Sequence, residues 1–174
     1  DIPHTVARAA QAAVNMGVDM FNLHAAGGSR MIQEAVAAAK TVAGQKGIPA
    51  PRILAVTVLT SLDDRDLNEI GFDKKADDLV CHLARLSLAS GATGVVASPR
   101  DLSLLRRELG DRFLIVTPGI RAARKEGNED DQKRTTSGYE AIRAGADYIV
   151  VGRPISKAAD PLEACREITQ EIAK

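Results

Sequence analysis

The segment Gly152-Arg153-Pro154 near the end of the sequence has residue types suited to binding an anion. It directly follows the apolar run DYIVV. Gly152 has no side chain, so a backbone N–H can approach an anion there, and Arg153 supplies a fork of N–H donors. Pro154 is suited to begin a short extra helix. We therefore predict a phosphate site, for which a solvated arginine on a tight turn is the simpler alternative.

Polar side chains also follow three other apolar runs. His24 ends the run VDMFNLH, Thr60 and Ser61 follow ILAVTVL, and Ser98 ends GVVAS. His24 could act as an acid, a base or a ligand. A lone histidine without cysteines or carboxylates at metal-ligand spacing is more typical of a structural hydrogen bond, which we expect here. Thr60 and Ser61 offer hydroxyls to a polar ligand, but no triad partner indicates nucleophilic catalysis.

Two charged segments lie between these runs. The segment 121–134 is polar, bears glycine and is too long for an ordinary connection, which predicts a loop that closes over a ligand. A surface loop without function is the alternative. The acidic run 63–66 indicates the start of a solvated helix, because carboxylates are favourable at a helix N-terminus.

The elements that must position these residues alternate along the chain. Near-continuous apolar runs of this length are typical of parallel strands that are covered on both faces. Alternating strands and helices then indicate βα units and a parallel sheet. The predicted strands are 18–24, 53–59, 94–98, 113–117 and 147–151, and the predicted helices are 3–16, 28–43, 74–90, 101–109, 136–144 and 161–173.

The same short pattern, a glycine at a predicted helix end followed by a turn, precedes several of the predicted strands. The segments NMGVDM, ASGATGVV and RAGADYIV each place glycine at a helix end. The repeat of roughly 30 residues is the unit of a (β/α)8 TIM barrel. Only five strands are present, so we expect Asp1 to end the third strand, with three strands preceding it and residues 1–174 forming one partial barrel domain. A doubly wound sheet is the alternative, although no glycine-rich dinucleotide fingerprint follows any strand.

Composition limits the partners. The 174 residues are 45% hydrophobic and 26% charged, with 23 basic and 23 acidic side chains. This balance favours a small ligand over nucleic acid or a membrane, and no run approaches the ~20 apolar residues that cross a bilayer. Cys81 and Cys165 lack disulfide or zinc spacing, which predicts two buried thiols in a cytoplasmic protein.

Six motifs, taken together, resemble the orotidine 5′-phosphate decarboxylase family over essentially the full length. They are DIPHTV, LHAAGG, VTVLTS, VTPGIR, DDQKR and VGRPI. The resemblance implies an enzyme that converts orotidine 5′-phosphate to UMP and CO2 in pyrimidine biosynthesis. It also implies a homodimer with sites shared across the interface, and no cofactor or metal.

The resemblance assigns roles to individual residues. Asp1 matches the last Asp of the family signature Asp-x-Lys-x-x-Asp-Ile-Pro, so the catalytic lysine would lie three residues before it. Asp1 would hold that lysine, and Thr60 would contact the pyrimidine. Two residues match those that reach into the neighbouring subunit's site, Ile2 and Thr5, and four match the phosphate-binding set, Arg121, Gln132, Gly152 and Arg153.

Two positions depart from the family pattern. His4 stands where Asn is usual, and Ala122 follows Arg121 where Pro is common. Neither change removes a matched contact group, although both concern local loop geometry. Two alternatives stay open: a metal-dependent 3-hexulose-6-phosphate synthase-like enzyme of the same superfamily, and a catalytically inactive phosphate-binding barrel that serves as an interaction module. The segments LTS and DDQKR favour the pyrimidine enzyme.

Overall fold

The computed structural model describes residues 1–120 and 136–173. All five predicted strands and all six predicted helices are present, some with shorter bounds. Two short helices, α3 and α7, add to them. The strands are β1 (Met20–His24), β2 (Arg52–Val56), β3 (Gly94–Val96), β4 (Leu114–Thr117) and β5 (Tyr148–Ile149). The helices are α1 (Pro3–Asn15), α2 (Gly28–Lys46), α3 (Asp64–Glu69), α4 (Ala76–Ala89), α5 (Leu102–Leu109), α6 (Gly138–Arg143), α7 (Arg153–Ser156) and α8 (Pro161–Ile172), with a 3-10 turn, η1 (Ala25–Gly27), after β1.

The strands form one parallel sheet in the order β1-β2-β3-β4-β5. Each strand pairs with the next strand of the chain, for example Gly94 with Leu114 between β3 and β4. A barrel wall adds its strands in chain order, whereas a doubly wound sheet reverses the order at a switch point. The observed order confirms the barrel-type α/β fold and contradicts the doubly wound alternative.

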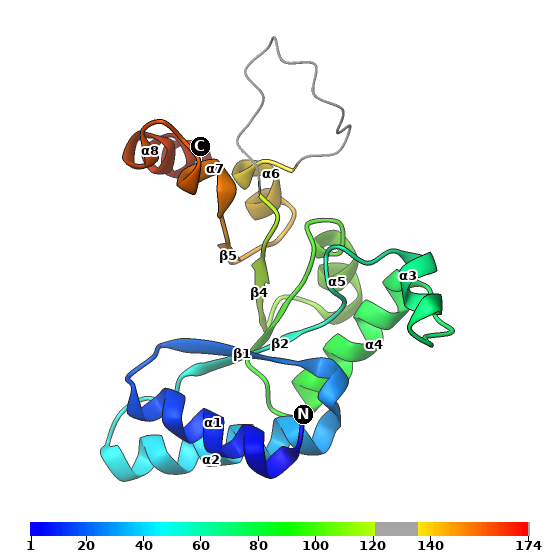
Figure 1. Ribbon diagram of the computed structural model, residues 1–174, viewed down its shortest axis with the longest axis vertical. Helices are drawn as coiled ribbons and strands as arrows, with labels where there is room; N and C mark the ends of the chain where they lie inside the picture. Colours follow the sequence, from blue (N-terminus) through cyan, green and yellow to red (C-terminus); the bar gives the residue numbers. More distant parts are fainter. Residues whose placement is uncertain (121–135, 174) are drawn as a thin grey trace.

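The two faces of the sheet differ in their cover. One row of paired residues, Leu23, Ala55, Val95 and Ile115, is at most 7% exposed and belongs to the core that the helices complete. Figure 1 shows α1 and α2 running along β1, with α4 and α5 beside the middle strands. Successive strand residues point to opposite faces. The next row therefore faces away from the helices, and its last member, Tyr148, is 41% exposed.

Glycines end the helices that precede the strands, as the repeated glycine pattern predicts. Gly17 after α1 has φ 76° and Gly145 after α6 has φ 114°, conformations that favour glycine. The acidic run also begins a helix, α3. The Asp63 carboxylate there accepts hydrogen bonds from the backbone N–H groups of Arg65 and Asp66. Both predictions are thus confirmed by local backbone geometry.

Arg106 connects α5 to the segments that lead into β4 and β5. Its guanidinium donates to the Gly145 carbonyl from Nη2 at 2.8 Å and to the Phe113 carbonyl from Nη1 at 2.9 Å. Nη2 also lies 2.7 Å from an Asp147 carboxylate oxygen, which in turn accepts the Ile115 N–H at 2.7 Å. Because one planar group satisfies acceptors on two connections, Arg106 fixes how α5 sits against this end of the sheet.

The prediction of two buried thiols is wrong. Cys165 is exposed and Cys81 only partly buried. The reason is that α8 buries a narrow side, of which Ile168 is the one buried residue, and leaves the Cys165 side of the helix in solvent.

Among the described residues, no helix combines the length and apolarity that crossing a bilayer requires.

Candidate functional site

The predicted site residues gather at the carboxyl edge of the sheet because all five strands are parallel. His24 ends β1, Thr60 and Ser61 follow β2, Ser98 follows β3, and Gly152 follows β5. Helix α1 runs back from this edge to the start of β1, so Asp1 at its beginning belongs to the same edge. The fold thus places residues from distant parts of the chain at one end of the molecule, as in TIM barrels.

A cavity of about 640 Å³ lies at this edge, between the ends of β4 and β5. Its lining residues come from the two connections that follow these strands. They are Pro118, Gly119, Ile120, Val150, Gly152, Arg153, Pro154 and Lys157. The predicted anion-binding segment therefore does line a cavity of ligand size.

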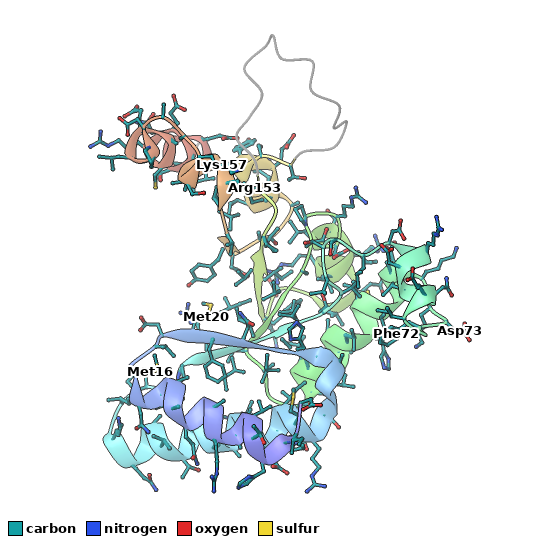
Figure 2. The ribbon with its side chains drawn as sticks, viewed as in Figure 1. Met16, Met20, Phe72, Asp73, Arg153 and Lys157 are labelled. Carbon is teal, nitrogen blue, oxygen red and sulfur yellow. The ribbon has the colours of Figure 1, made fainter. Side chains whose placement is uncertain are left out.

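The charge that the described residues give this cavity is positive. Arg153 and Lys157, the first residue of α7 and the residue after its end, are both exposed and lie together on the ribbon in Figure 2. No carboxylate lines the cavity, and neither cation has a hydrogen-bond or ion-pair partner among the described residues. Sequence reasoning missed Lys157. The signal was its position four residues after Arg153, one helical turn away.

Gly152 leaves open space in the cavity wall. A Cβ atom built on this residue would meet no atom within 4 Å, so packing within the described residues does not require the glycine. A position where backbone must come close to a ligand has this property. The prediction that Pro154 begins a short helix is also confirmed, because it is the second residue of α7.

A second cavity, of about 660 Å³, lies at the opposite edge, where the strands begin. Its cation, Arg52, contacts the Tyr148 hydroxyl and lies 5.9 Å from the centre of the Tyr148 ring. Met20 of β1 lines this cavity and is labelled in Figure 2, far from Arg153. Because Arg52 is already engaged, and chemistry in parallel α/β folds lies at the carboxyl edge, the cavity beside Arg153 is the candidate functional site.

The other predicted contact residues stand apart from that cavity. Asp1, Ile2, Thr5 and Thr60 are exposed at the same edge, and no hydrogen bond joins their side chains to one another within 1–120 and 136–173. Arg121 and Gln132, with the predicted closing loop, lie outside the described residues. The described part also contains no group of three or more His, Cys, Asp or Glu side chains placed to hold a metal ion.

His24 does not make the structural hydrogen bond that the sequence predicts. Its side chain is exposed, and it has no hydrogen bond with another described residue. The reason is its register. Leu23 beside it is buried towards the helices, so His24 points to the opposite face of an edge strand, where no described element covers it.

Asp101 is a buried carboxyl beside the loop that follows β3. The residue is 8% exposed, and its side chain accepts the Ser98 N–H at 3.0 Å. Burial raises the pKa of the Asp101 carboxyl from its ordinary 3.8 to about 6, and the Asp77 carboxylate adds to the increase. The native state therefore holds a proton on Asp101 at pH values where the unfolded chain has lost it.

This pKa predicts a pH-dependent stability. The native-state pKa is raised, so the stabilisation is complete below pH 3.8 and is lost as the pH rises through about 6. Relative to Asp101→Asn, the wild-type free energy of unfolding should fall by about 1–3 kcal/mol between about pH 4 and pH 7. Urea titrations of both proteins measure this difference. A difference that is constant across this range would contradict the raised pKa.

Comparisons with known proteins show the family to which this chain belongs. The sequence model of the orotidine 5′-phosphate decarboxylase / HUMPS family matches residues 1–168. An orotidine 5′-phosphate decarboxylase of Syntrophus aciditrophicus (strain SB) is 51% identical over 175 residues, covering 100% of this chain and 69% of the relative. One of Moorella thermoacetica is 49% identical over 173 residues, covering 99% of this chain and 68% of the relative.

A solved structure extends the likeness to the fold. The crystal structure of orotidine 5′-phosphate decarboxylase from Lactobacillus acidophilus matches with a TM-score of 0.85 and 38% sequence identity. The match covers 100% of this chain and 72% of that chain. With a family match over nearly every residue and relatives at about half identity, this chain belongs to the orotidine 5′-phosphate decarboxylase / HUMPS family.

Proposed function

We propose that this chain, as a partial TIM-barrel domain of residues 1–174, belongs to a cytoplasmic decarboxylase that converts orotidine 5′-phosphate to UMP and CO2. The observation that carries the proposal is the cavity at the ends of β4 and β5, where Arg153 and Lys157 face no carboxylate of a described residue. A cavity of about 640 Å³ with two free cations fits a phosphorylated small molecule. Relatives at about half identity that carry this activity support the substrate.

In the proposed complex the phosphate lies against the Gly152 backbone and the Arg153 guanidinium, with Arg121 and Gln132 completing the set. Thr60 contacts the pyrimidine. Ile2 and Thr5 reach the site of a second subunit in a homodimer. Phosphate binding away from the reacting carbon can supply energy for orientation at that carbon.

The reaction needs a stabilised carbanion. The bond between C6 and the carboxylate carbon breaks, CO2 leaves, and the electron pair stays on C6. Because no cofactor takes up these electrons, fixed charge must stabilise them. The lysine that we place three residues before Asp1 supplies that charge and then a proton to C6, which gives UMP. Asp1 holds this lysine in position beside the departing carboxylate.

Turnover by the full-length protein tests the proposal. Purified protein without added metal should consume orotidine 5′-phosphate and release CO2 and UMP in equal amounts, measured by the change in pyrimidine absorbance and by trapped CO2. Metal-dependent condensation of formaldehyde with a pentulose phosphate, without decarboxylation, would instead support the hexulose-phosphate synthase alternative. Binding of UMP without turnover of orotidine 5′-phosphate would support the inactive barrel.

A further inference from the structure

Two like charges share one wall of the phosphate cavity. The Lys157 backbone N–H donates to the Arg153 carbonyl at 3.0 Å, so the two residues are one helical turn apart on α7. Both line the same cavity, and the remaining lining residues are glycine, proline, valine and isoleucine. Like charges at this spacing repel each other when nothing neutralises them. Among the described residues nothing neutralises these two charges, which favours an anion with more than one charge in the cavity.

We propose that Lys157 is a second phosphate-binding residue, which makes the cavity prefer a phosphate dianion over a monoanion. The inference rests on the proposed function and deepens it. A phosphate monoester has a second pKa of about 6 and so carries nearly two negative charges at neutral pH. Arg153 is the one cation of the proposed phosphate-binding set among the described residues, and it offsets one of these charges. Lys157 offsets the other with an ammonium on a flexible stem that reaches the same ligand from the end of α7.

The two cations have different tasks. The guanidinium of Arg153 is planar and can donate two parallel hydrogen bonds, which fixes the orientation of the phosphate. The Lys157 ammonium acts as a point charge, which adds attraction with little directional demand. Charge, rather than side-chain identity, is then what position 157 must provide. Lys157→Arg should accordingly keep most of the affinity, whereas Lys157→Met should not.

Binding of UMP, inorganic phosphate and uridine to the full-length protein tests this role. Isothermal titration calorimetry on wild type, Lys157→Met and Lys157→Arg should show the Kd for UMP about fivefold to tenfold higher in Lys157→Met, as for loss of one exposed charge-assisted contact. Lys157→Arg should stay within about twofold of wild type, and uridine should bind all three equally. Lys40→Met on α2, an exposed lysine outside the cavity, is the matched control and should leave every Kd unchanged.

The pH profile separates charge recognition from a structural role. Wild-type affinity for UMP should fall as the pH drops through about 6, because the phosphate then loses one charge. The fall should be smaller in Lys157→Met. Equal UMP affinity in wild type and Lys157→Met, an equal loss for UMP and uridine, or an unchanged pH profile would each overturn the inference. Wild type that binds UMP without decarboxylating orotidine 5′-phosphate fails the proposed function alone, whereas wild type that binds neither UMP nor inorganic phosphate overturns both.

Discussion

Replacing Arg153 with alanine in the full-length protein should lower kcat/KM for orotidine 5′-phosphate by about tenfold to a hundredfold. Hydrogen bonds to charged groups contribute about 1.5–3 kcal/mol, and each 1.4 kcal/mol corresponds to about a factor of ten. Arg153 lines the cavity without any partner among the described residues, so its donors are available to the ligand. Steady-state kinetics with the nucleotide measure the loss.

Three comparisons make the Arg153 result specific. The phosphate-free nucleoside orotidine should react equally in wild type and Arg153→Ala, because it has nothing for the guanidinium to bind. Arg153→Lys should recover part of the loss, since it restores charge without the planar fork. Arg166→Ala on α8, whose exposed ion pair with Glu163 is 3.5 Å long, should have no effect. Equal proportional losses for nucleotide and nucleoside would mean that Arg153 supports the fold instead.

Arg106→Met should lower the free energy of unfolding of the full-length protein by about 2–4 kcal/mol. The substitution keeps a flexible apolar side chain but removes every donor from the Phe113 and Gly145 carbonyls and from the Asp147 carboxylate. It also removes the cation from above the Phe113 ring, 4.9 Å from its centre. Loss of several charge-assisted hydrogen bonds at a site that is only 19% exposed gives this magnitude.

The neighbouring arginine provides the control for this prediction. Arg107 is 67% exposed and, among the described residues, pairs only with Glu108 at the surface, so Arg107→Met should change the free energy of unfolding by less than about 1 kcal/mol. Urea titration followed by circular dichroism measures both variants. Arg106→Met protein that is folded should keep its Kd for UMP, because Arg106 lies at the end of the sheet opposite the phosphate cavity. Similar stabilities for the two variants would refute the role assigned to Arg106.

The sequence predicted those parts of the protein that depend on local chemistry. Apolar runs located the five strands, and the glycines that end helices located the turns before them, because both signals lie within a few neighbouring residues. The segment from Gly152 to Pro154 located the cavity for the same reason. Features that depend on distant neighbours were not predictable. Arg106 acquires its role from Gly145, 39 residues later, which no local pattern indicates.

The exposure of individual side chains was also predicted poorly from the sequence. Cys165 and His24 were assigned from residue type alone, yet their environments depend on which side of α8 and which face of β1 they occupy. Lys157 was missed because a lone lysine after a short helix resembles any surface lysine. Its spacing of four residues from Arg153 becomes a strong signal once the cavity is known and no carboxylate of a described residue is found on its lining.

The chain-order pairing of the strands also has a consequence for how the protein is made. Each strand forms hydrogen bonds with the strand before it in the chain. The edge to which a new strand pairs has therefore already been synthesised when that strand leaves the ribosome. Loop closure then spans only the connection between two consecutive strands at each step, which keeps the entropic cost of each addition small. We expect the sheet to grow in the direction of translation, from β1 towards β5, with the anion cavity formed last on the ribosome. At each stage the latest strand presents an unpaired edge until the next strand docks, and such an edge can pair with another chain and aggregate.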